Sequence, residues 1–287
     1  MRWEGRRQSK NVEDRRQISA GPVMVGGGLL TILFMLVLMF LGVAPEQIAQ
    51  IAAPQQQRAP RQQQRQQQPD ANDEMKQFVS VVLADNEDVW GKLFPKHFQA
   101  RYSPPTLVLF TGQVKSACGF ASAAAGPFYC PLDGKVYIDL AFYEELKRRF
   151  GAPGDFAQAY VIAHEIGHHV QNQLGISENV QSMRPRLSER DYNKLSVRME
   201  LQADFLAGVW AHHVARYAGI VDEDDIREAV NAAAAIGDDR IQKQTQGFIV
   251  PDAFTHGTSE QRVRWFLYGL KEGNPELMNR AFEVDDP

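Results

Sequence analysis

Two histidines four positions apart, His164 and His168, are the residues of this chain best suited to chemistry, and Glu165 lies between them. They lie in an apolar run that predicts a buried helix. Positions four apart on a helix differ by about 40° in direction, so the two imidazoles point the same way, one turn apart. Such a pair can bind one metal ion, and Glu165, about 100° aside, can reach a water on that ion.

A catalytic zinc ion needs a third protein ligand and one open position. One class of zinc peptidase uses a third histidine six residues after the second, but this chain has Leu174 there, which excludes that class. Another class takes a glutamate from a later helix, with an aspartate four residues on, as Glu200 and Asp204 are spaced. Glu200 would complete the ligand set, and Asp204 would accept the free ring N–H of a ligand histidine. The alternative is an exposed helix face carrying two ordinary carboxylates.

A hydrolytic site of this kind also needs a group that stabilises the oxyanion formed during attack. Three candidates are His256, Tyr129 and Tyr137, and His256 is favoured because it precedes a helix whose start is marked by Thr258 and Gln261, the pattern of a capping box. The two tyrosines are also candidates for binding substrate, since the segment 129–139 could offer a strand edge to an extended peptide. An ordinary structural hairpin is the alternative for that segment.

Four segments resemble the bacterial neutral zinc metallopeptidases, a family with one N-terminal membrane helix. They are 164–171, 200–204, 126–131 and 256–262. The resemblance implies a gluzincin-like domain, peptidase chemistry and zinc as the cofactor, one ion per chain. It names no physiological substrate.

Residues 21–43 contain no charge and are almost wholly apolar, which predicts a transmembrane helix and a lipid bilayer as partner. A cleaved signal peptide is the alternative, but the apolar part is too long for one and no convincing cleavage site follows. More Lys and Arg precede this stretch than follow it, so the positive-inside rule predicts that residues 1–20 form a cytoplasmic basic tail. The rest of the chain would then lie outside the cytoplasm, in the periplasm of a Gram-negative cell.

Residues 44–70 are rich in Gln, Pro and Arg and contain few core-forming side chains, so they predict a solvated linker. Residues 1–70 hold nine Lys or Arg and five Asp or Glu, whereas the whole chain has a net charge of −4. The main domain, 71–287, is therefore acidic. This charge argues against nucleic acid as a partner.

Short strands are predicted at 107–110, 127–130 and 135–139, followed by helices at 140–150, 155–174, 188–217, 223–236 and 258–271. This order predicts an α+β fold, mostly helical with a small antiparallel sheet. The only cysteines, Cys118 and Cys130, are either a disulfide outside the cytoplasm or two free thiols.

These features predict a membrane-anchored zinc peptidase in which Glu165 is the general base for attack of water on a peptide bond. Two other functions fit the same residues. The site could act on cell-wall peptides as an amidase or peptidase. The chain could also be a binding protein that keeps the metal scaffold without catalysis, although such a protein has no need of Glu165 beside two metal-binding histidines.

Overall fold

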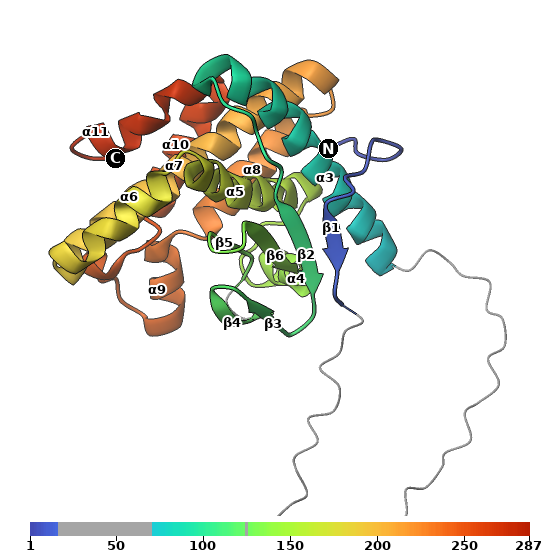
Figure 1. Cartoon of the computed structure of the whole chain (residues 1–287). Helices are drawn as coiled ribbons and strands as arrows, with labels where there is room; N and C mark the ends of the chain where they lie inside the picture. The colour runs from blue at the N-terminus through green and yellow to red at the C-terminus, as the bar shows by residue number, and fades with distance from the viewer. Residues whose placement is uncertain (17–70, 124–125) are drawn as a thin grey trace, which may run out of the picture. The chain divides into compact units, whose positions relative to one another are not determined.

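The computed structural model describes residues 1–16, 71–123 and 126–287. The strands are β1 (Val12–Asp14), β2 (Thr106–Phe110), β3 (Gln113–Ser116), β4 (Gly119–Ser122), β5 (Phe128–Cys130) and β6 (Lys135–Asp139). The α-helices are α3 (Ala71–Leu93), α4 (Ala141–Arg148), α5 (Asp155–Gln173), α6 (Ile176–Met183), α7 (Glu189–Ala218), α8 (Glu223–Ala235), α9 (Asp238–Gln246), α10 (Ser259–Glu272) and α11 (Arg280–Glu283). Helices therefore dominate the described part of the chain, and the α+β expectation is confirmed (Figure 1).

The main sheet has four strands in the order β1-β2-β6-β5. The pairs β1–β2 and β2–β6 are parallel, and only β5–β6 is antiparallel, so the predicted antiparallel sheet is wrong in this respect. The reason lies in the connections. The chain forms the separate β3–β4 hairpin and then β5 before β6 returns beside β2, and a long connection of this kind allows parallel pairing.

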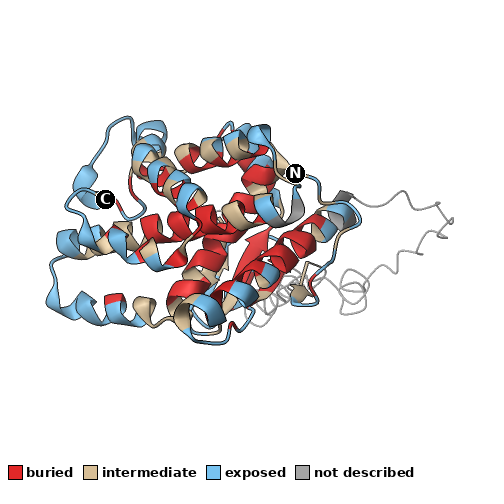
Figure 2. Cartoon of the chain, turned by 90° about the horizontal axis from the view of Figure 1, so that it is seen from above, coloured by how far each residue is buried: buried red, intermediate tan, exposed pale blue. Residues whose placement is uncertain are grey.

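Helix α5 is the centre of the domain. It contacts β5 and β6 on one side and α7 and α8 on another, and it also meets α3 (Figure 1). Residues on every side of α5 are buried, as expected for a helix enclosed by other elements. Buried residues concentrate in the middle of the domain, and exposed ones cover its outer faces (Figure 2).

Helices α7 and α10 pack closely because of two glycines. A side chain at Gly208 would come within 2.1 Å of the carbonyl oxygen of Phe266, and one at Gly269 within 2.0 Å of the carbonyl oxygen of Phe205. Only glycine permits this approach of two backbones. The first turn of α10 carries the predicted capping box, in which Thr258 and Gln261 bond each other's backbone N–H groups.

Residues 1–16 and 71–287 form one compact unit. Strand β1 pairs with β2 from Val12 to Asp14, and the ring of Trp3 packs edge-on against Phe78 in α3. The prediction of a separate tail at residues 1–20 is therefore wrong for residues 1–16. That prediction was based on the charge of the segment. The number of charges does not show that a segment forms hydrogen bonds and ring contacts with the domain.

No helix in the described ranges is both long and apolar enough to cross a bilayer. The predicted span at 21–43 and the predicted linker at 44–70 lie outside the described residues.

Cys118 and Cys130 form a disulfide that joins the β3–β4 hairpin to the end of β5. Cys130 is completely buried, in a small cluster with Val108 and Tyr137. The bond therefore connects the separate hairpin to the main sheet.

Candidate metal centre

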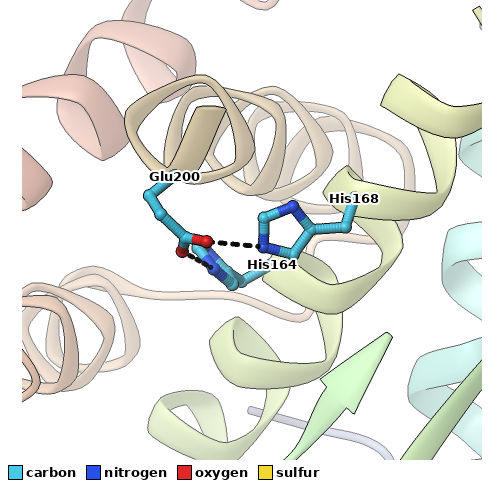
Figure 3. A group of neighbouring side chains, drawn as sticks. All are labelled: His164, His168 and Glu200. Atoms are coloured by element: carbon cyan, nitrogen blue, oxygen red, sulfur yellow. Dashed lines mark hydrogen bonds and ion pairs between the residues drawn. The ribbon is translucent and has the colours of Figure 1, made fainter. Parts of the chain in front are cut away.

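The side chains of His164, His168 and Glu200 meet at one point between α5 and α7 (Figure 3). One ligand-type atom from each lies within 4.8 Å of the others. The Nε2 atom of His164 is 3.1 Å from Oε2 of Glu200, and Nε2 of His168 is 3.4 Å from Oε1. Two ligands of one tetrahedral zinc ion, each at its usual bond length, are about 3.3 Å apart. The residues present therefore fit a zinc ion.

Gly167, inside the histidine motif, allows this convergence. A side chain at Gly167 would come within 2.9 Å of the carbonyl oxygen of Ala203. Ala203 lies between Glu200 and Asp204, so the backbone of α7 touches α5 at the position of the cluster. Without this contact α7 would lie farther away and Glu200 would not reach the imidazoles.

His164 is oriented from its other ring nitrogen by Asp204. Its Nδ1 donates to Oδ1 of Asp204 at 2.8 Å, so Nε2 is left facing Glu200. Asp204 is completely buried and also accepts two hydrogen bonds from the Arg262 guanidinium, at 2.8 and 3.0 Å. The Tyr160 hydroxyl donates to the same carboxylate at 2.5 Å. Asp204 thus has partners from α5 and α10 as well as from the cluster.

His168 is oriented by an amide. Its Nδ1 donates to the side-chain oxygen of Gln171 at 2.8 Å, one turn along α5. Gln171 is completely buried, and its NH₂ group donates to the Met199 carbonyl at 2.7 Å and to the Gln202 side chain at 2.9 Å. Both histidines therefore present Nε2 to the cluster, and both ring orientations are fixed by buried groups.

The Glu200 carboxylate and the two imidazoles stabilise each other's charged forms. Burial alone would raise the pKa of Glu200, but the charge of His168 and hydrogen bonds from both histidines hold this pKa well below its usual value. Burial would lower the pKa of His168, and the Glu200 carboxylate outweighs it and raises the pKa to about 9. Binding of a dication to His168 would therefore displace a proton from its imidazole.

Asp204 remains ionised although it is buried. Burial would raise its pKa, but the positive charge of Arg262, with that of His164, holds the pKa at about 2. A buried ionised carboxylate of this kind strengthens the basicity of the imidazole that it faces.

A cavity of about 440 Å³ opens onto the cluster. Its wall includes Glu165, the three cluster residues and His256, together with apolar side chains from α4, α5 and the start of α9. Glu165 is buried and points into this cavity rather than joining the cluster. A water or a peptide in the cavity would therefore face both the cluster and a free carboxylate.

The position of His256 on the cavity wall is set by Asp238. The Nδ1 of His256 donates to Oδ1 of Asp238 at 3.2 Å, and the other carboxylate oxygen accepts the backbone N–H groups of Thr255 and His256 at 2.7 and 2.6 Å. Burial would lower the pKa of His256, but the Asp238 hydrogen bond and the charge of Glu200 raise it. The cationic form of this imidazole on the cavity wall is therefore favoured.

The two tyrosine candidates are placed differently. Tyr129 lies on the cavity wall, but its hydroxyl donates to Nδ1 of His169 at 3.0 Å and accepts from the Asn172 side chain at 2.9 Å. Tyr137 is not part of the wall, and its hydroxyl donates to Asp133 in the hairpin turn at 2.7 Å. The structure therefore brings His256 to the cavity, gives the Tyr129 hydroxyl other partners, and places Tyr137 in the sheet.

Several residues that hold the cluster or His256 were missed by the sequence-based prediction: Tyr160, Gly167, Gln171, Gln202, Asp238 and Arg262. Gly167, Gln171, Gln202 and Arg262 lie inside segments that carried the family resemblance, and this was the one available signal. Nothing in their spacing shows which partner each would find.

A second group of carboxylates also has the spacing of ligands. Asp155, Asp225 and Glu228 lie within 4.8 Å of one another in the described part of the chain. The amino group of Met1 lies between two of them, 2.5 Å from Asp155 and 2.6 Å from Asp225. This group therefore already has a cation.

The comparisons with known proteins agree with the geometry. A family model described as "Putative neutral zinc metallopeptidase" matches residues 1–281. The chain is 47% identical over 288 residues to "Uncharacterized protein YpfJ" of Escherichia coli K12, covering 97% of this chain and 98% of that protein. It is 41% identical over 217 residues to "Uncharacterized protein Rv2575" of Mycobacterium tuberculosis, covering 71% of each. No solved structure matches. The chain therefore belongs to this zinc metallopeptidase family.

Proposed function

We propose that the protein is a zinc-dependent hydrolase of peptide bonds, with one zinc ion held by His164, His168 and Glu200. The observation that carries the proposal is the convergence of two imidazole nitrogens and one carboxylate at distances that suit a zinc ion, beside a cavity. This ligand set is that of catalytic zinc sites of the gluzincin type. A purely structural zinc site is normally closed by four protein ligands.

Bound zinc would lower the pKa of a water molecule and polarise the carbonyl of the scissile bond. Glu165 is the general base in this proposal. It lies next to His164 in sequence, lines the same cavity and is not part of the ligand group, so its carboxylate is free to take a proton from the attacking water. The same carboxyl then returns the proton to the nitrogen of the leaving amine.

His256 would stabilise the oxyanion. Its side chain is on the cavity wall, its Nδ1 is held by Asp238, and its raised pKa favours the cationic form. The remaining ring nitrogen, Nε2, is then a charged donor. Donors of this kind typically contribute 10²–10³ in rate.

Strand β5 is suited to bind the substrate backbone. It is an edge strand of the main sheet, and Phe128 and Tyr129 of this strand line the cavity. An extended peptide could pair with the edge through main-chain hydrogen bonds and so present one peptide bond to the cluster. Tyr129 would then act through its backbone and ring, since its hydroxyl already has partners.

The test compares the purified full-length chain with the Glu165→Gln variant, because residues 1–16 belong to the folded domain and a fragment without them would lack β1. Zinc content is measured by atomic spectroscopy and cleavage with a mixed peptide library. We expect about one zinc per chain in both proteins and cleavage only by the wild type. Equal cleavage by both would remove Glu165 from the mechanism, and zinc in neither would remove the site.

A further inference from the structure

His169 follows the metal-binding pair on α5 but is directed away from the cluster. Adjacent positions on a helix differ by about 100°, so the rings of His168 and His169 point in different directions. The His169 side chain is buried, and its ring contacts the rings of Tyr102 and Tyr129 edge-on, with centroids 5.8 and 5.4 Å away. Its contacts therefore lie on the β5 side of α5 and not at the cluster.

The two ring nitrogens of His169 connect two segments of the chain. Nε2 lies 2.7 Å from the carbonyl oxygen of Ser103, which can only accept, so Nε2 carries the proton. Nδ1 is then an acceptor, and the Tyr129 hydroxyl donates to it at 3.0 Å. His169 is therefore held by the segment before β2, and it holds the side chain of Tyr129 in β5.

Two more side chains from the same face of α5 complete this contact. Positions 169, 172 and 173 share a face because they are three and four residues apart. The NH₂ group of Asn172 donates to the Tyr129 hydroxyl at 2.9 Å. Gln173 forms two hydrogen bonds with the backbone of Ser103, at 2.9 and 3.0 Å. The Tyr129 hydroxyl thus donates to one side chain of α5 and accepts from another.

Strand β5 depends on such contacts because it is short. It has three residues and pairs with β6 along one edge only. Successive side chains of a strand point to opposite faces of the sheet. Cys130 lies in the small cluster on one face, where its disulfide with Cys118 attaches the β3–β4 hairpin. Tyr129 points to the other face, and it is the member of β5 whose side chain hydrogen-bonds to α5.

We propose that His169 is a positioning residue for the substrate. Helix α5 carries the imidazoles of the cluster on one face and, through His169 and Asn172, fixes the edge strand from another. A peptide paired with the free edge of β5 is thereby held at a set distance from the cluster. The proposal rests on the proposed peptidase function, with β5 as the edge that binds substrate. Misplacement of a reacting group by about 1 Å can lower the rate about 100-fold, so loss of this contact affects turnover.

Two substitutions of His169 test the proposal in the full-length protein. His169→Asn keeps an acceptor near the position of Nδ1, whereas His169→Phe keeps an aromatic ring without nitrogen. With an extended peptide that the wild type cleaves, we expect kcat/KM to fall about 10–100-fold in His169→Phe and by less in His169→Asn, with zinc near one per chain in both. A role in packing alone predicts the reverse order, because Phe fills the space better than Asn. That order would overturn the proposal.

Tyr129→Phe removes only the hydroxyl and shows whether His169 acts through that group. We expect His169→Phe to cause no further loss of kcat/KM when Tyr129→Phe is already present, whereas independent roles would multiply the two losses. Multiplied losses would overturn the proposal. The control is His212→Gln, since His212 also donates to a backbone carbonyl, that of Leu270 at 2.7 Å, and is absent from the cavity wall. Its kcat/KM should equal that of the wild type.

The same variants separate this proposal from the proposed function. Cleavage by the wild type that none of the substitutions at His169 and Tyr129 alters would leave the peptidase function in place and remove only the role of His169. No cleavage by the wild type would end both. Amide hydrogen exchange of residues 128–130 needs no activity, and we expect it to be faster in Tyr129→Phe because β5 is held less firmly. Unchanged exchange would contradict the proposal.

Discussion

Among the described residues, two clusters bring three ligand-type side chains within 4.8 Å, and one of the two is a credible metal site. The first combines His164, His168 and Glu200 between α5 and α7. The second consists of three carboxylates, Asp155, Asp225 and Glu228, and the Met1 amino group pairs with two of them. Spacing alone does not separate the two clusters.

The other partners of each side chain separate them. In the first cluster each imidazole is held through Nδ1 by a buried acceptor, Asp204 or Gln171, so each Nε2 is left without another role. In the second, Glu228 accepts the backbone N–H of Phe156. In a metal site, the ligand side chains are thus fixed by other hydrogen bonds, and their remaining lone pairs point to one position. In a structural cluster, the lone pairs already accept hydrogen bonds or ion pairs from groups of the protein.

The largest expected difference between the clusters is in zinc affinity. Glu200→Gln removes the only charged ligand of the first cluster, so we expect zinc affinity to fall by more than about 100-fold. Loss of a residue that only hydrogen-bonds to a metal ligand typically lowers affinity by about 10–100-fold. The matched change in the second cluster, Glu228→Gln, is expected to leave zinc affinity unchanged. Competition with a chelating dye measures both. Loss of zinc from Glu228→Gln alone would reverse the assignment of the two clusters.

The next difference is in turnover, because the cavity beside the first cluster also carries Glu165 and His256 on its wall. His256→Phe removes the donor proposed for the oxyanion, so we expect kcat to fall by about 10²–10³ while zinc content stays near one per chain. The control is His97→Gln, at a histidine paired with Glu276 and absent from the cavity wall. Unchanged kcat in His256→Phe would leave the oxyanion without its proposed partner.

A smaller effect on zinc affinity is expected at Asp204, which contacts the ligand His164 and not the metal position itself. Asp204→Asn keeps the shape of the side chain but removes the charge that faces His164, so zinc affinity should fall by about 10–100-fold. The same isosteric change in the second cluster, Asp225→Asn, should not alter zinc affinity. The dye assay again reports both variants. Equal losses in the two would mean that the Asp204 contact is not specific to the metal site.

The smallest effect is the pH dependence of stability in the metal-free protein. The folded pKa of Asp204, about 2, lies below that of an unfolded aspartate, about 3.9. The stabilisation from its ionised form is therefore complete above pH 4 and is lost as the pH falls toward 2. Denaturant unfolding of wild type and Asp204→Asn at several pH values should show the wild type losing more stability over this range. Parallel curves would contradict the ion pair with Arg262.

The helix pattern and the ligand spacing were predictable from the sequence because both are local. The motif at 164–168 sets the direction of two imidazoles by helical geometry alone, and the boundaries of α5, α8 and α10 lie within two residues of the predicted ones. The convergence of α5 and α7 was inferred from the need of a catalytic zinc ion for a third ligand and from the spacing of Glu200 and Asp204. Gly167, which permits their contact, carries no chemistry and so gave no sign of its role.

The unpredicted parts all depend on contacts between distant segments. Arg262 pairs with Asp204 at a separation of 58 residues in sequence, and β1 pairs with β2 at a separation of about a hundred residues. Neither pairing follows from periodicity or propensity, which are local properties. The basic N-terminal segment was interpreted as free charge because its acidic partners lie in α3. Charge counted along a sequence does not show which charges are already paired in the fold.

The most direct test of the central claim is the position of zinc in crystals of the full-length protein, from anomalous diffraction at the zinc edge. The account predicts one strong peak per chain, about 2 Å from Nε2 of His164, Nε2 of His168 and a carboxylate oxygen of Glu200. A peak among Asp155, Asp225 and Glu228 instead, or no peak in zinc-loaded crystals, would contradict it.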